Sequence, residues 1–179
     1  SVEVRPLPAQ MPEVWLLGSS GQSAAWAGVH DLNYAYAQFF TGRQQGEIMN
    51  HYRAHLPEGP GRGPIHGGQT LSALCVSAAA TREEAREQAL VAADARFSLR
   101  TGRPMRFRDP ATLDAAYRAE VERYLERDTA IIVGAYDEVA QALSAFAENH
   151  GTEEVMLVSY IDDVEVKVRQ YAELASRLL

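Results

Sequence analysis

The segment from residue 12 to residue 40 constrains the fold of this chain more than any other. A short apolar run at residues 14–17 stops at Gly18, and an alanine-rich helical pattern runs from Ser23 to about residue 30. A second apolar run, rich in aromatic side chains, covers residues 33–40. Strand, tight turn, helix and strand in this order form a βαβ unit, and such units build parallel sheets.

The same alternation continues along the rest of the chain. Thr81, with Glu84 three positions later, is a capping box that opens a helix reaching to about residue 99, and Gly151 ends a helix over residues 137–149. The other predicted elements are a helix at 44–56, a strand at 70–79, a helix ending near 126 that Asp109 or Thr112 caps, a short extended segment at 130–133, a strand at 154–161 and a helix at 163–178. We therefore expect one α/β domain over residues 1–179, with four main parallel strands near 14–17, 34–40, 71–77 and 155–159.

The turn between the first strand and the first helix is a candidate ligand site. Ser19, Ser20, Gly21, Gln22 and Ser23 follow the carboxyl end of a predicted strand, where α/β folds bind their ligands. The serine hydroxyls can donate to phosphate oxygens, and the N–H groups that open the helix point the same way. Serine is also a common N-cap, so an ordinary structural turn is the alternative interpretation.

The residues around this turn resemble those of the flavin-dependent, bacterial luciferase-like monooxygenases. The motif P-x-V-W-L-L-G-S-S-G-x-S-A-x-x-A at residues 12–27 is followed by Y-A-Y-A-x-x-F at 34–40. Near the end, I-V-G at 132–134 and the following helix precede E-E-V-M-L at 153–157, similar to the family's closing helix and strand. Similar family strands often carry a histidine one residue before the final phenylalanine. This chain has Phe39 there, so no proton-transfer role is assigned to that position.

The resemblance implies a (β/α)8 barrel of the TIM type, of which this chain resembles the second, C-terminal half. A complete barrel takes about 250 residues, whereas this chain has 179 and begins just before the segment that resembles the fifth strand. We therefore expect the missing N-terminal half of the barrel as a partner. We also expect a homo-oligomer, because a half-barrel leaves sheet edges unpaired. A self-sufficient small α/β domain is the alternative, because its size would suit this length.

The resemblance further implies an enzyme: an FMN-dependent monooxygenase or oxidoreductase that uses reduced FMN and dioxygen on a small organic substrate. The turn at residues 19–23 would hold the phosphate and ribityl end of the flavin, with Ser20 and Ser23 where the family contacts phosphate. A non-catalytic flavin-binding or assembly protein, and a deazaflavin-dependent oxidoreductase, are the alternatives. The sequence leaves open whether the flavin is bound tightly or supplied by a flavin reductase, and it identifies no catalytic acid or base.

The net charge and the lengths of the apolar runs argue against two classes of partner. The net charge of −7 argues against nucleic acid, because phosphate backbones require clustered Lys and Arg. No apolar run approaches the ~18 residues of a membrane span, so no membrane partner is expected. Cys75 is the single cysteine and has apolar neighbours, which predicts a buried strand residue in a protein of the reducing cytoplasm.

The remaining candidates each have a structural alternative. His51 and His55 have the i, i+4 spacing of a shared metal, but no carboxylate or cysteine completes the set nearby, so we expect a helix-surface pair and no metal site. The aromatic residues of the second strand, Tyr34, Tyr36 and Phe40, either pack in the core or line a flavin ring. Substrate-covering loops are expected at residues 57–68 and 100–110. Arginines that either meet an anionic ligand there or stay solvated are Arg62, Arg100, Arg103, Arg106 and Arg108.

Overall fold

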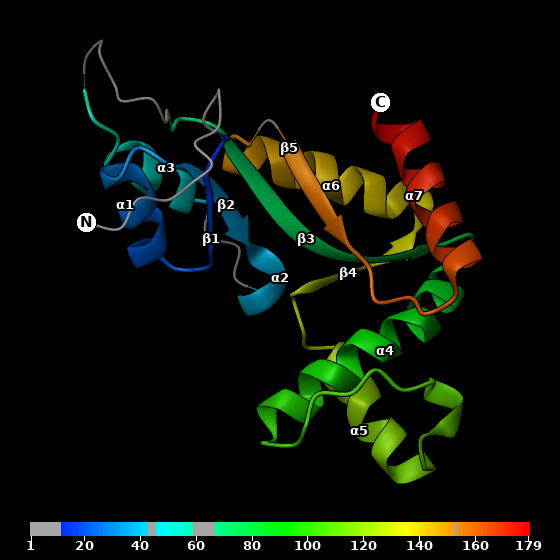
Figure 1. The fold of residues 1–179 in the computed structure, drawn as a ribbon. Helices are drawn as coiled ribbons and strands as arrows, with labels where there is room; N and C mark the ends of the chain where they lie inside the picture. Colours follow the sequence, from blue (N-terminus) through cyan, green and yellow to red (C-terminus); the bar gives the residue numbers. More distant parts are fainter. Residues whose placement is uncertain (1–11, 43–45, 59–66, 153) are drawn as a thin grey trace.

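A computed structural model describes residues 12–42, 46–58, 67–152 and 154–179 (Figure 1). These residues contain one parallel sheet with the strand order β1–β2–β3–β4, and β5 pairs with β3. The strands are β1 (Trp15–Gly18), β2 (Asn33–Ala37), β3 (Thr70–Ala79), β4 (Ile131–Ala135) and β5 (Glu154–Val158). The predicted parallel sheet is confirmed, and the extended segment expected at 130–133 is a fifth strand, β4.

Strand β3 organises the sheet, because it is the longest strand and is buried along its whole length. Its first four residues pair with β2, and its last five, Cys75 to Ala79, pair with β4. Residues 71–75 pair with β5. Within the described sheet β1 pairs with β2 alone, and β4 and β5 each pair with β3 alone, so each of these three strands has an edge that the sheet does not cover.

Seven α-helices and one 3₁₀ turn occur in the described residues, and most of the predicted caps are present. Thr81 caps α4 through a capping box with Glu84, Asp163 caps α7, and Gly151 ends α6 in the left-handed conformation. Asp109 caps the 3₁₀ turn η1 instead of a long helix, and Asp114 caps α5. The elements are α1 (Gly21–Val29), α2 (Gln38–Thr41), α3 (Ile48–Arg53), α4 (Arg82–Arg100), η1 (Pro110–Thr112), α5 (Ala115–Leu125), α6 (Tyr136–His150) and α7 (Val164–Leu178).

Three predicted elements are shorter than expected. The strand predicted over residues 154–161 is β5, which ends at Val158. The strand predicted over residues 33–40 ends at Ala37, because Gln38 turns inward and donates from Nε2 to the carbonyl oxygen of Thr129 at 3.0 Å, starting the short helix α2. The helix predicted over 44–56 is α3, and it ends at Arg53 because its last turn tightens to i→i+3 bonds just before Pro57. Residues 44 and 45 of that prediction lie outside the described residues.

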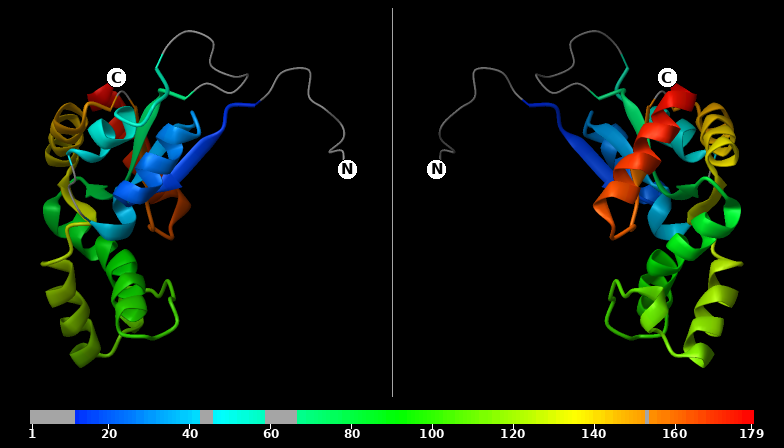
Figure 2. Two further views of the ribbon diagram at one scale, coloured as in Figure 1. Left: turned by 90° about the vertical axis from the view of Figure 1, so that its left-hand side faces the viewer. Right: turned by 90° about the vertical axis from the view of Figure 1, so that its right-hand side faces the viewer.

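The two faces of β3 pack against different helices, as its period of two requires. Leu74 and Val76 belong to a core cluster with α1, α3 and α6, whereas Cys75 points to the other face, against α4 and α5. Helices α4 and α5 form a hairpin, the α4–α5 arm, that extends away from the rest of the molecule in all three ribbon views (Figures 1 and 2). The arm starts at the carboxyl end of β3 and therefore lies at the end of the sheet where ligands bind in such folds.

Candidate functional site

The predicted serine turn connects β1 to α1 and carries a complete capping box. Ser20 is the N-cap: its Oγ accepts from the N–H of Ser23 at 3.2 Å. The hydroxyl of Ser23 in turn accepts from the N–H of Ser20 at 3.2 Å and donates to the carbonyl oxygen of Ser20 at 2.7 Å. The N–H groups of Gly21 and Gln22, at the first two positions of the helix, have no acceptor within it and face its N-terminal end.

The turn is also tied to the sheet through Tyr34. Its hydroxyl donates to the carbonyl oxygen of Gly18 at 3.0 Å and lies 3.3 Å from Ser23 Oγ. Burial raises the pKa of Tyr34 above its ordinary value, so the hydroxyl stays protonated and able to donate at physiological pH. A Cβ atom at Gly18 would lie 2.2 Å from Ser23 Oγ. The Ser23 side chain thus points toward the inside of the turn, whereas Ser19 and Ser20 lie on the outer side, facing the cleft.

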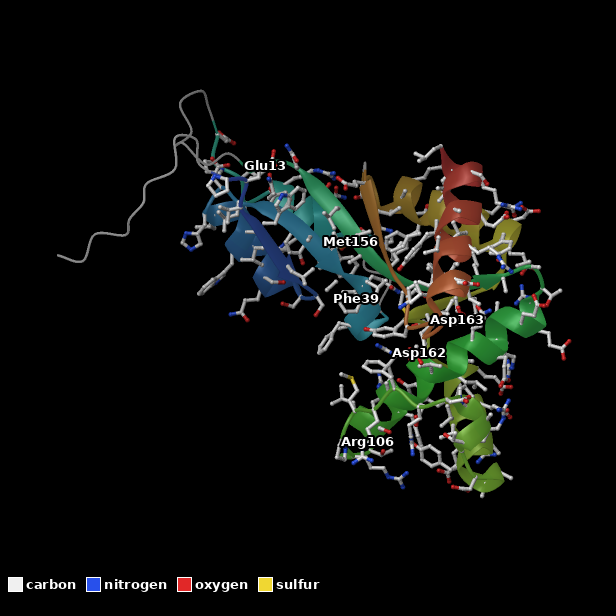
Figure 3. The ribbon with its side chains drawn as sticks, turned by 45° about the vertical axis from the view of Figure 1, so that its right-hand side comes forward. Glu13, Phe39, Arg106, Met156, Asp162 and Asp163 are labelled. Atoms are coloured by element: carbon white, nitrogen blue, oxygen red, sulfur yellow. The ribbon has the colours of Figure 1, made fainter. Side chains whose placement is uncertain are left out.

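A cleft of about 470 Å³ opens beside Ser19 and Ser20, between the turn, α2 and the α4–α5 arm. Its walls are formed by Ser19, Ser20, Phe40, Thr41, Arg96, Leu99, Arg100 and Tyr124. Figure 3 shows Phe39, which immediately precedes Phe40, at the end of the sheet near α4, together with Asp162 and Asp163 after β5; Glu13 lies at the opposite end. The cleft therefore lies at the carboxyl end of the strands.

An ion pair fixes the arm beside this cleft. The guanidinium of Arg96 donates to both carboxylate oxygens of Asp128 and, from Nη1, to the carbonyl oxygen of Phe39 at 2.6 Å. Burial alone would raise the pKa of Asp128, but the hydrogen bonds from Arg96 and from the N–H of Ala130 outweigh it and hold that pKa below its usual value. Asp128 is therefore ionised at neutral pH and neutralises Arg96.

Arg100, one helical turn after Arg96, supplies the cleft's remaining charge. No Asp or Glu is among the residues that line the cleft. With Arg96 neutralised by Asp128, the wall carries one net positive charge in a chain whose net charge is −7. Phe40 and Leu99 add exposed apolar surface, with 63% and 56% of their surface accessible. The cleft thus combines hydroxyl and N–H donors, a cation and an apolar wall, which suits an anion attached to an apolar or aromatic body.

The other aromatic and thiol candidates of the sequence are core residues, with one exception. Tyr34 and Tyr36 are fully buried in the first core cluster, so the packing interpretation is confirmed for them, whereas Phe40 is exposed in the cleft. Cys75 is buried as predicted, and burial raises the pKa of its thiol to about 12. This thiol is therefore protonated and unreactive near neutral pH.

The histidine candidates form no metal site in the described residues, and of the arginine candidates described there, Arg100 lines the cleft. His51 and His55 stack edge to face, with ring centroids 4.6 Å apart, and no group of three His, Cys, Asp or Glu suited to a metal ion occurs in the part of the chain that the structure describes. Arg108 is held by Asp94, and Arg103 lies over the ring of Tyr117. Arg62 lies outside the described residues. Arg96 and Tyr124, which the sequence reasoning missed, line the cleft beside Arg100.

The structure describes all residues of one of the two expected covering loops. Most of the loop at 57–68 lies outside the described residues. The loop at 101–110 runs along the α4–α5 arm, and its Phe107 stacks on Tyr160 after β5, with ring centroids 5.1 Å apart. A second cleft of about 440 Å³ lies there, between this loop and the β5–α7 connection. None of the helices among the described residues is both long and apolar enough to cross a membrane.

Comparisons with known proteins show which proteins this chain is similar to. No model of a known protein family matches the sequence. The uncharacterized protein YwcH of Bacillus subtilis is 30% identical over 166 residues, which are 89% of this chain and 48% of that protein. The N-acetyl-S-alkylcysteine monooxygenase of the same organism is 26% identical over 98% of this chain and 52% of its own length. The chain therefore spans about half the length of the curated relatives it matches.

Solved structures agree with the sequence relatives. The crystal structure of apo-MsnO8 has a TM-score of 0.77 and 27% identity, covering 99% of this chain and 54% of that one. Two more distant structures share the fold: an F420-dependent secondary alcohol dehydrogenase (TM-score 0.60, 13% identity, 96% of this chain and 50% of that one) and a Pseudomonas putida type II Baeyer–Villiger monooxygenase with FMN (0.53, 18%, 94% and 49%). The predicted resemblance and fold class are thereby confirmed: the chain is similar to the luciferase-like flavin monooxygenases and has the α/β fold of their barrels.

Proposed function

We propose that this chain is part of an FMN-dependent monooxygenase and that its serine turn holds the phosphate end of the flavin. The observation that carries this proposal is the cleft beside Ser19 and Ser20, which joins a turn with hydroxyl and N–H donors to a cationic and apolar wall at the carboxyl end of the sheet. The monooxygenase among the sequence relatives and the FMN-bound structure with the same fold support it.

The residues present fit such a cofactor. The Ser19 hydroxyl would donate to the phosphate, and so would the Ser20 hydroxyl in place of its 3.3 Å bond to Ser23 Oγ. The N–H groups of Gly21 and Gln22 would point at the phosphate, and Ser23 would hold the turn in shape through its bonds to the backbone of Ser20. Bound reduced flavin would supply the electrons for dioxygen chemistry on a small organic substrate. The chain's own part is to bind and orient the cofactor and to exclude water, with Phe40 and Leu99 as the apolar wall.

Two alternatives remain testable in the same assay. A deazaflavin-dependent oxidoreductase is supported by the F420-dependent enzyme among the structures of this fold, and a non-catalytic flavin-binding protein would use the same turn. Purified full-length protein should bind FMN more tightly than deazaflavin and should consume oxygen when reduced FMN and substrate are supplied. Preference for deazaflavin would favour the first alternative, and FMN binding that supports no turnover with any substrate tried would favour the second.

The serine turn itself can be tested by removing its outward hydroxyls. Hydrogen bonds to charged groups contribute about 1.5–3 kcal/mol each. Replacing both Ser19 and Ser20 with alanine should therefore weaken FMN binding about a hundredfold or more, whereas riboflavin, which lacks the phosphate, should bind nearly as before. Isothermal titration of both ligands measures this contrast.

Ser23→Ala and Ser176→Ala are the controls for this experiment. Ser23→Ala removes the N3 half of the capping box, as Ser20→Ala removes the N-cap half, and each change should lower stability by about 1 kcal/mol. Ser176 lies on α7, where its hydroxyl donates to the carbonyl oxygen of Glu173 and accepts from Arg177 Nη1 at 3.4 Å. Ser176→Ala should leave both ligands unaffected. Equal losses for FMN and riboflavin in the Ser19, Ser20 double variant, or no loss for either, would remove the turn from the binding site.

We further infer that residues 1–179 form a single domain, the C-terminal half of a luciferase-like barrel, and that additional βα units cover its inner face. The relatives are about twice as long as this chain. Leu17 on β1 and Met156 on β5 lie on two of the strands with an unpaired edge, and 59% and 52% of their surface is exposed. In a closed barrel such strands pair with further strands and such side chains are buried.

The chain of 179 residues on its own should therefore self-associate. Sedimentation should show species larger than the 19.7 kDa monomer, and a dye that reports apolar surface should bind. Replacing Leu17 and Met156 with lysine should reduce both effects, while the same replacement of Val164 and Val168, exposed on α7, should change them less. A compact monomer without dye binding would contradict the half-barrel interpretation.

A further inference from the structure

We propose that Arg100, at the end of α4, is a second anchor for the anionic end of the ligand, on the wall of the cleft opposite the serine turn. This inference rests on the proposed function, because it takes the anion to be the flavin phosphate. It adds a binding residue from the α4–α5 arm, which the sequence resemblance does not assign. Arg100 and the turn residues Ser19 and Ser20 line the same cleft.

Arg100 differs from the other arginines of α4 in its partners. Arg82 pairs with Glu138, Arg86 with Glu126 and Arg96 with Asp128. Arg100 forms no ion pair with any residue that the structure describes, and its recorded contact is with the ring of Tyr124, 5.9 Å from the ring centroid. The exposed guanidinium therefore keeps its full charge and its N–H donors for a ligand.

The position of Arg100 is fixed by the residue one helical turn before it. Arg96 ties α4 to α2 through the carbonyl oxygen of Phe39, and to the segment before β4 through Asp128, which itself accepts from the N–H of Ala130. Side chains at i and i+4 share one face of a helix, so this attachment directs Arg100 toward the same side of α4. Helix α4 is thus held where its last residue, Arg100, reaches the cleft.

The neighbours of Arg100 define the kind of ligand. Leu99 and Phe40 are exposed apolar side chains in the same cleft, and no carboxylate lines it to compete for the guanidinium. An inorganic anion would leave this apolar surface uncovered, whereas a phosphate joined to a planar or apolar body would use both parts. Arginine is suited to phosphate because its planar fork can donate two parallel hydrogen bonds.

The test compares Arg100→Gln with Arg103→Gln in the full-length protein. Both remove one charge from the end of the arm, but Arg103 is placed over the ring of Tyr117 and does not line the cleft. Arg100→Gln should weaken FMN binding about tenfold and leave riboflavin unaffected, because the residue is exposed and its charge is screened. Arg103→Gln should leave both unchanged, and Arg100→Lys should recover part of the loss.

The dependence of FMN affinity on salt concentration is a second measurement, and a purely structural role of Arg100 would not change it. The FMN affinity of the wild-type protein should fall as ionic strength rises, and Arg100→Gln should flatten this dependence. If FMN binding depends on Ser19 and Ser20 but is the same in Arg100→Gln, the Arg100 inference is wrong and the proposed function stands. If riboflavin is weakened as much as FMN, Arg100 acts on packing and the inference is also wrong. If the wild-type protein binds no FMN, the proposed function itself fails.

Discussion

Replacing Arg108 with alanine is expected to lower the free energy of unfolding by about 3–5 kcal/mol, because it leaves a buried carboxylate without its counter-charge. The side chain of Asp94 on α4 is fully buried. It accepts from Arg108 Nε at 2.8 Å and also from Arg108 Nη2, and the hydroxyl of Tyr117 donates to it at 2.8 Å. Because Arg108 is half-exposed and Asp94 is buried, the cost of breaking the pair comes from the unpaired charge of Asp94. Chemical denaturation with two-state analysis measures the change.

Arg103 provides the matched control for this prediction. It lies in the same loop and its guanidinium is 5.2 Å from the ring centroid of Tyr117, a cation–π contact that at an exposed site contributes about 0.5–1 kcal/mol. Arg103→Ala should therefore cost far less than Arg108→Ala. Arg108→Lys should cost an intermediate amount, because lysine keeps the charge but loses the paired N–H donors. Equal and small losses in all three variants would mean that Asp94 is satisfied without Arg108.

The pair also has a functional consequence, because it fixes the loop at 101–110. Phe107, next to Arg108, stacks on Tyr160 beyond β5 and helps to form the second cleft. Loss of the pair should free this loop from α4, and protease sensitivity in the loop should rise together with the loss of stability. A loop fixed by an ion pair to a buried carboxylate is well defined in position, which is what a wall of a binding cleft requires.

The sequence predicts the local parts of this fold well, because their causes lie within a few residues. The strand, turn and helix of residues 12–30 follow from an apolar run, small residues and an N-cap. The capping box at Thr81 and the αL glycine at Gly151 are likewise local. By contrast, the end of β2 at Ala37 depends on Gln38 reaching Thr129, far along the chain, and no local pattern reports such a contact.

The candidate site likewise has one part that depends on local sequence and one part that depends on contacts between distant residues. The serine turn could be predicted because it is contiguous, but the inward direction of Ser23 depends on its packing beside Tyr34 on β2. The opposite wall of the cleft could not be predicted, because Arg96 reaches Phe39 across 57 positions of the sequence. Arg96 and Arg100 have the i, i+4 spacing of one helix face, and that was the available signal. The spacing indicates a shared face but not what the face covers.

Gly42→Ala is expected to destabilise the protein by about 2–5 kcal/mol, because it combines backbone strain with a steric clash. Gly42 ends α2 with φ of +68°, a conformation that residues with a Cβ adopt only at a cost. A Cβ there would also lie 2.8 Å from the backbone nitrogen of Ala130 and 2.9 Å from Thr129 Oγ1. Thr129 already donates to the carbonyl oxygen of Gly42 at 2.7 Å, so the two segments cannot separate without losing that bond.

Gly102 separates the two contributions. Its φ is +72°, close to that of Gly42, but no atom lies within 4 Å of the position that its Cβ would take. Gly102→Ala should therefore show the conformational cost alone, about 1–2 kcal/mol, and the difference between the variants should report the clash with Ala130. Gly42 follows Phe40 and Thr41, which line the cleft. Gly42→Ala should accordingly also weaken flavin binding, while Gly102→Ala should not. Equal destabilisation by both substitutions would show that the backbone at Ala130 shifts without cost to admit the Cβ atom. The contact between the end of α2 and the segment before β4 would then have no part in shaping the cleft.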